Sequence, residues 1–121
     1  MSNPFVHVEL LSTDVGQSRA FYGKPFDWKF EDMPFGPDTY TVIKVGEGTG
    51  GGLVRNPIPG AGSDWLAYVK VDDVAAMTSK ARSLGAAVVN NVTEVKGAGS
   101  FSIIKDPTGA LLGLWQSKSG A

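Results

Sequence analysis

The sequence FVHVELLSTDVGQ, residues 5–17, joins a strand pattern to the start of a helix. In residues 5–11 the apolar Val6, Val8 and Leu10 alternate with a set that includes the polar His7 and Glu9. This pattern is typical of a strand with one apolar face and one polar-tolerant face. Asp14 can accept hydrogen bonds from the first free amides of a helix, and Gln17 stands three residues later, as in a capping box. The pattern predicts a strand and then a helix that ends before Pro25.

The same order of elements is predicted twice along the chain. After the first helix we expect three short strands, over residues 28–32, 40–45 and 51–55. The order then begins again with a strand over residues 65–71 and a helix capped by Asp73 and terminated at Gly85. Three more strands are predicted over residues 86–92, 101–105 and 110–116. Each half is therefore a βαβββ module, and the fold class is α+β.

The segment 56–63 separates the two halves, because its prolines and glycines suit a linker better than the interior of a helix or strand. We expect one domain over residues 1–121, made of half-repeats 1–55 and 64–121. Each half has a single helix, which can cover only one face of its sheet. The uncovered face is where we expect the functional site.

Composition excludes several classes of function. A chain of 121 residues with 42% hydrophobic residues can build one core. Its net charge of −1, from scattered acidic and basic residues, provides no field for nucleic acid or anionic lipid. Without cysteine there is no disulfide, thiolate metal site or cysteine nucleophile. Neither a secretory signal nor a membrane span is evident, so we expect a cytoplasmic protein.

Four short motifs distributed along the chain resemble those of one known family. They are HVEL at residues 7–10, RAFY at 19–22, YVKVDDV at 68–74 and DPTGA at 106–110. Together they resemble the vicinal oxygen chelate superfamily, which includes glyoxalase I, extradiol dioxygenases, and the fosfomycin- and bleomycin-resistance proteins. The resemblance implies two βαβββ modules whose sheets form a half-open curled sheet around a cleft, and it implies a homodimer.

Strand alternation predicts which side chains face that cleft. If the helix covers the side of Leu10, then His7 and Glu9 face the cleft, and similar alternation applies to the other inner strands. Aromatic residues near the strands could form a wall for a planar ligand. The predicted ligand-binding residues are His7, Glu9, Trp28, Tyr40, Leu53, Arg55, Tyr68, Lys70, Gly113 and Trp115.

The resemblance also implies a metal site in catalytic members, with three or four His, Glu or Gln ligands. Carried over by position, the ligands fall on His7, near Leu53, on Leu66 and on Gly113, and only the first of these can bind metal. A catalytic metal typically needs three protein ligands. We therefore predict no metal, no cofactor and no catalytic residue.

His7 and Glu9 each leave two interpretations open. His7 is either a hydrogen-bonding or proton-transferring group of the cleft, or a half-buried strand residue paired with a carbonyl or with Glu9. An inward carboxylate is costly without a partner, so Glu9 is either compensated by Arg55 or Lys70 or awaits a cationic or hydroxyl-rich ligand. The glycine-rich segment 46–52 is not a phosphate loop, because it lacks a Lys-Ser/Thr pair and does not open a helix.

The predicted function is metal-independent binding of a small, partly aromatic organic molecule, for sequestration or sensing. The alternative is a glyoxalase- or dioxygenase-like enzyme, a lyase, isomerase or oxygenase with an incomplete metal site. A third class is a partner-binding domain whose cleft is filled by a neighbouring chain. The missing metal ligands separate the first class from the second, whereas nothing in the sequence separates the first from the third.

Overall fold

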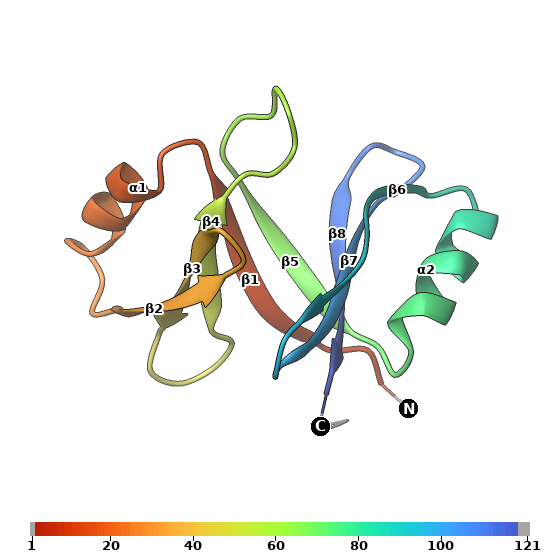
Figure 1. Ribbon diagram of the computed structural model, residues 1–121, viewed down its shortest axis with the longest axis horizontal. Coiled ribbons are helices and arrows are strands. Elements are labelled where there is room, and N and C mark those ends of the chain that lie inside the picture. The colour runs from red at the N-terminus through yellow and green to blue at the C-terminus, as the bar shows by residue number, and fades with distance from the viewer. Residues whose placement is uncertain (1, 119–121) are drawn as a thin grey trace. The chain divides into compact units, whose positions relative to one another are not determined.

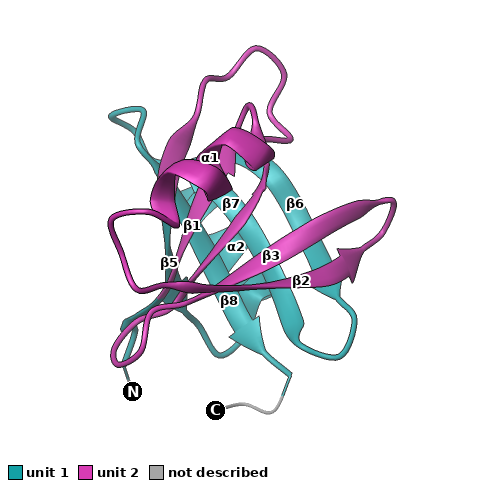
Figure 2. Ribbon diagram, turned by 90° about the vertical axis from the view of Figure 1, so that its left-hand side faces the viewer, with its two compact units in different colours: residues 1–6, 67–121 teal, residues 7–66 magenta. Residues whose placement is uncertain are grey.

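A computed structural model describes residues 2–118 of the chain. Its backbone contacts divide the chain into two compact units, which Figure 2 shows in different colours. Among the described residues, unit 2 comprises residues 7–66 and unit 1 comprises residues 2–6 and 67–118, so the division falls inside two strands, which are assigned below to the unit that holds most of their residues. The linker expected at 56–63 contains neither helix nor strand.

Unit 2 contains a four-stranded sheet and one helix (Figure 1). Its strands lie in the order β2-β3-β4-β1, with β1 parallel to β4 and the other neighbours antiparallel. The helix covers one face of this sheet, where its residues pack against Leu10, Ile43 and Leu53. The elements are β1 (Phe5–Ser12), α1 (Val15–Tyr22), β2 (Lys29–Phe35), β3 (Asp38–Lys44) and β4 (Gly51–Arg55).

Unit 1 has the same construction. Its strands lie in the order β5-β8-β7-β6, again with one parallel pair, β5 and β8. The helix packs on one face against a core of Val71, Val74, Ile104 and Leu114. The elements are β5 (Asp64–Lys70), α2 (Val74–Ser83), β6 (Ala87–Val95), β7 (Gly99–Lys105) and β8 (Leu111–Ser117). The predicted α+β class and the two βαβββ modules are confirmed.

Both helices begin where their capping residues predict. Asp14 accepts a hydrogen bond from the Gln17 amide at 3.0 Å, and Asp73 accepts one from the Ala76 amide at the same distance. These bonds satisfy amides that have no partner within the helix. Gly85 follows α2 with a φ of 107°, as expected for its terminator.

The structure differs from the prediction between β2 and β3. Residues 33–38 were expected to be a loop, but β2 continues to Phe35 and β3 begins at Asp38, which pairs with Phe35. Gly36 has a φ of 59°, which allows a tight two-residue hairpin turn. Pro34 is tolerated within the strand because β2 lies at the edge of this sheet, where a missing amide donor costs little.

Helices α1 and α2 are both short. Within residues 2–118, no helix has the length and apolar character needed to cross a membrane.

Candidate functional site

The helix-free face of the unit 2 sheet carries a polar network. Leu10 lies in the core with α1, so its neighbours in alternation, His7 and Glu9, lie on the other face of β1, as predicted. Strand pairing aligns Val42 of β3 with Gly52 of β4, and Gly52 with Glu9 of β1, so these three residues share one face. Tyr40 lies two residues before Val42 on β3 and therefore points to the same face.

Tyr40 joins the two residues of β1 through its hydroxyl group. The hydroxyl donates a hydrogen bond to Glu9 Oε1 at 2.9 Å and lies 2.6 Å from His7 Nε2. Glu9 is only 7% exposed, so this network replaces water around a carboxylate that would otherwise be costly to bury. Tyr40 is a partner for Glu9 that the sequence interpretation did not consider.

Burial also acts on the imidazole of the network. Desolvation lowers the pKa of His7 below its ordinary value, because the charged form loses more hydration than the neutral form. A neutral imidazole has one N–H, and the Tyr40 proton is directed to Glu9. In this arrangement His7 Nε2 donates its proton to the Tyr40 oxygen.

Gly52 makes room for the Tyr40 ring and was missed in the sequence interpretation. A Cβ atom at this position would overlap the Tyr40 hydroxyl group. The signal was present in the sequence, because adjacent glycines inside a strand often mark a close approach of another group.

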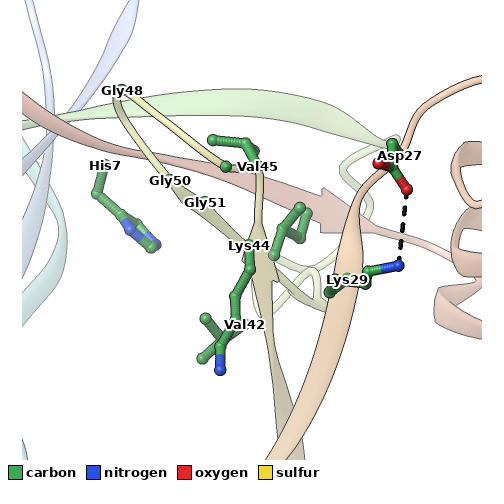
Figure 3. A pocket seen from close by; sticks show the side chains of 11 residues that line it. His7, Asp27, Lys29, Val42, Lys44, Val45, Gly48, Gly50 and Gly51 are labelled. Carbon is green, nitrogen blue, oxygen red and sulfur yellow. Dashed lines mark ion pairs between the residues drawn. The ribbon is translucent and has the colours of Figure 1, made fainter.

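Unit 2 also contains a concavity, and Figure 3 shows the side chains that line it. Its volume is about 560 Å³, within the roughly 300–1,000 Å³ typical of small-molecule sites. His7 is the member of the network that lines it, so the imidazole connects the network to this space. The lining residues are His7, Asp27, Lys29, Val42, Ile43, Lys44, Val45, Gly46, Gly48, Gly50 and Gly51.

Four of the predicted ligand-binding residues share the helix-free face of the unit 1 sheet. The parallel register of β5 and β8 aligns Tyr68 with Gly113 and Lys70 with Trp115, while Leu114 lies in the core with α2. The alternation predicted for these two strands is therefore confirmed. The Tyr68 ring packs edge-on against Phe101 and fills the space above Gly113.

The predicted face is wrong for β4. Leu53 aligns with Leu10 and is 1% exposed in the core beneath α1, so it lies opposite to Glu9. Arg55 has the same parity as Leu53, and it donates a hydrogen bond to Asp38 at 2.9 Å. The prediction was shifted by one residue along β4, because the parallel pairing of β1 and β4 places Gly52, and not Leu53, on the face of Glu9.

Trp28 also lies apart from the network. It immediately precedes β2 and packs on the side of α1, against Tyr22 and Phe26, with ring centroids 6.0 and 4.7 Å away. The ring belongs to an aromatic cluster around the end of α1. The ligand-binding roles of the ten residues stay predictions.

The metal site that the family resemblance implies does not fit the residues present. Of the four carried-over positions, Leu53 and Leu66 are buried apolar residues, and Gly113 lies under the Tyr68 ring. Gly52, which aligns with Glu9, has no ligating side chain either. Among the described residues, no three His, Cys, Asp or Glu side chains form a group that could hold a metal ion.

Comparison with known families identifies the class of this chain. Residues 5–114 match the family model of the Glyoxalase/Bleomycin resistance protein/Dioxygenase superfamily. This match covers most of the chain, and the chain belongs to that superfamily. The resemblance inferred from its short motifs is confirmed.

Two curated relatives illustrate the range of names in the family. The protein named "Putative glyoxylase CFP32" of Mycobacterium tuberculosis is 34% identical over 116 residues, which are 91% of this chain and 44% of that protein. The anthracycline biosynthesis protein DnrV of Streptomyces peucetius is 27% identical over 123 residues, covering 89% of this chain and 45% of that protein. The chain thus spans less than half the length of these relatives.

Solved structures show the same fold at low identity. The hypothetical protein BH1468 from Bacillus halodurans has a TM-score of 0.75 and 16% identity, and the match covers 100% of this chain and 99% of that one. Methylmalonyl-CoA epimerase from Mycobacterium tuberculosis has a TM-score of 0.68 and 17% identity, covering 93% and 87%. At these identities the likeness concerns the fold alone.

Proposed function

We propose that this protein binds a small, partly aromatic organic molecule without the help of a metal ion. The observation that supports this proposal is the network of His7, Tyr40 and Glu9 on the helix-free face of unit 2. Hydrogen bonds among the three side chains fix their positions, and His7 lines a concavity of suitable volume. Small-molecule sites commonly combine such a space with a few fixed polar groups.

The lining of the concavity suits an amphipathic ligand. Val42 and Val45, which are partly buried, offer apolar contact, whereas His7 offers a ring nitrogen and an aromatic edge. The glycines of the β3–β4 connection leave the backbone accessible to a flat molecule. The names of the family and of one relative, which refer to bleomycin and to anthracyclines, support aromatic natural products as probes.

Thermal unfolding in the presence of EDTA tests the proposal. The probes are bleomycin, an anthracycline and a panel of smaller aromatic natural products. A ligand at 100 times its Kd stabilises the folded state by about 2.7 kcal/mol. For a chain of this size that corresponds to a rise of roughly 10 °C in Tm, at about 4 °C per kcal/mol.

Two variants make this test specific. Tyr40→Phe removes the central hydroxyl of the network and is expected to reduce the ligand-induced shift, whereas Tyr22→Phe is the matched control in the aromatic cluster of α1. A ligand shift that vanishes in EDTA and returns with zinc would contradict metal-independent binding. The absence of a shift with every probe would contradict the proposed ligand class.

An enzyme of the same superfamily is the second candidate. The relative named as a glyoxylase favours it, and a histidine, a tyrosine and a carboxylate in contact could move a proton. A glyoxalase assay with and without added divalent metals distinguishes the two functions. Turnover that is lost in His7→Gln would favour the enzyme.

A further inference from the structure

The hydroxyl of Tyr40 stands between the two side chains of β1 that could ligate a cation. It lies 2.6 Å from His7 Nε2 and 2.9 Å from Glu9 Oε1. We infer that this hydroxyl occupies the position that a metal ion would need on His7 and Glu9, and that Gly52 is the positioning residue that admits it. The inference deepens the proposed function, since it explains why binding at this face would be independent of metal.

Imidazole geometry supports this competition between the hydroxyl and a metal ion. A ring nitrogen forms its hydrogen bond and its metal bond along the same in-plane direction. A zinc ion would lie about 2.0–2.2 Å from an imidazole nitrogen and from a carboxylate oxygen. Because the Tyr40 oxygen lies 2.6 Å from Nε2, an ion bound to that nitrogen and the hydroxyl cannot both be accommodated between His7 and Glu9.

The backbone under the hydroxyl group is adapted to it. A Cβ at Gly52 would overlap the hydroxyl oxygen and the ring carbon that bears it. Any residue larger than glycine would therefore move the Tyr40 ring away from His7 and Glu9. The Tyr40 ring also packs edge-on against the Phe35 ring, with centroids 6.1 Å apart, and this contact helps to fix the orientation of the Tyr40 side chain.

Unit 1 independently shows a tyrosine above a strand glycine. A Cβ at Gly113 would overlap three ring atoms of Tyr68. Gly113 is one of the positions to which the family resemblance assigns a metal ligand. Within each unit, a tyrosine ring thus fills the space that a ligating side chain from the neighbouring strand would use.

Zinc titration of tag-free protein, labelled with ¹⁵N at histidine, tests the inference without any substitution. His7 is the only histidine of the chain, so its two ring-nitrogen resonances need no assignment. We expect them to stay unchanged at zinc concentrations up to the millimolar range. A shift at micromolar zinc in the wild-type protein would overturn the inference.

Tyr40→Ala is the complementary variant. Removing the ring exposes His7 and Glu9 to the ion, and we expect the zinc affinity measured by calorimetry to rise at least tenfold. The gain should disappear in Tyr40→Ala combined with His7→Gln. An unchanged zinc affinity, or a gain that persists without His7, would contradict the inference.

Gly52→Ala tests the positioning role. Displacement of Tyr40 should change the ring-nitrogen shifts of His7 in metal-free protein, and Gly62→Ala is the control because a Cβ there meets no other atom within 4 Å. Unchanged His7 shifts in a folded Gly52→Ala protein would exclude that role. These readouts use zinc alone, so their failure is distinct from failure of ligand binding in EDTA.

Discussion

Tyr40→Phe is expected to destabilise the protein substantially, although it removes a single oxygen atom. The lost hydroxyl donates to a carboxylate that is 7% exposed and also contacts His7 Nε2. A hydrogen bond to a charged group contributes about 1.5–3 kcal/mol and a neutral one about 0.5–1.5 kcal/mol. The expected loss in the free energy of unfolding is therefore about 2–4 kcal/mol, or roughly 8–16 °C in Tm.

Urea unfolding at pH 7.5 measures this loss, with Tyr22→Phe as the control for the same chemical change. Combining Tyr40→Phe with Glu9→Gln completes a double-mutant cycle, in which we expect a coupling energy of at least about 1 kcal/mol. A loss for Tyr40→Phe no larger than that for Tyr22→Phe would refute the assigned network. So would additive effects of the two substitutions in the cycle.

The remaining predictions concern pH, packing and assembly. Burial lowers the pKa of His7 in the folded state, so the unfolded state binds more protons below about pH 6.5. The free energy of unfolding, measured with urea, should therefore fall from pH 7.5 to pH 5.5. The His7→Gln substitution should flatten that decline. An equal decline in the variant would exclude His7 as its source. Leu53→Ala should cost about 2–5 kcal/mol because it leaves a cavity under α1, whereas Leu84→Ala, at a side chain that is 72% exposed, should change stability by less than about 0.5 kcal/mol. Similar costs at both positions would contradict the core assignment. The homodimer implied by the family resemblance should appear in sedimentation at micromolar concentration, and a monomer alone would disprove it.

Local patterns in the sequence were sufficient for the elements and for most of their faces. Asp14 and Asp73 mark the helix starts because a capping carboxylate acts on amides only a few residues away. Alternation in β1 placed His7 and Glu9 opposite the helix because successive side chains of a strand point to opposite faces. These signals depend on neighbours in the chain, so they can be recognised without knowledge of the fold.

Contacts between distant segments were decided only by the tertiary structure. The register of β1 against β4 places Gly52, not Leu53, on the face of Glu9, and a shift of one residue reverses every side chain of a strand. The bond from Tyr40 to Glu9 joins residues 31 positions apart, through a strand pairing that no local pattern specifies. The sequence by itself thus determined the family, the two modules and one strand of the site. Only the pairing of strands decided that Tyr40 joins His7 and Glu9 in the site, because register is set by packing across the whole sheet.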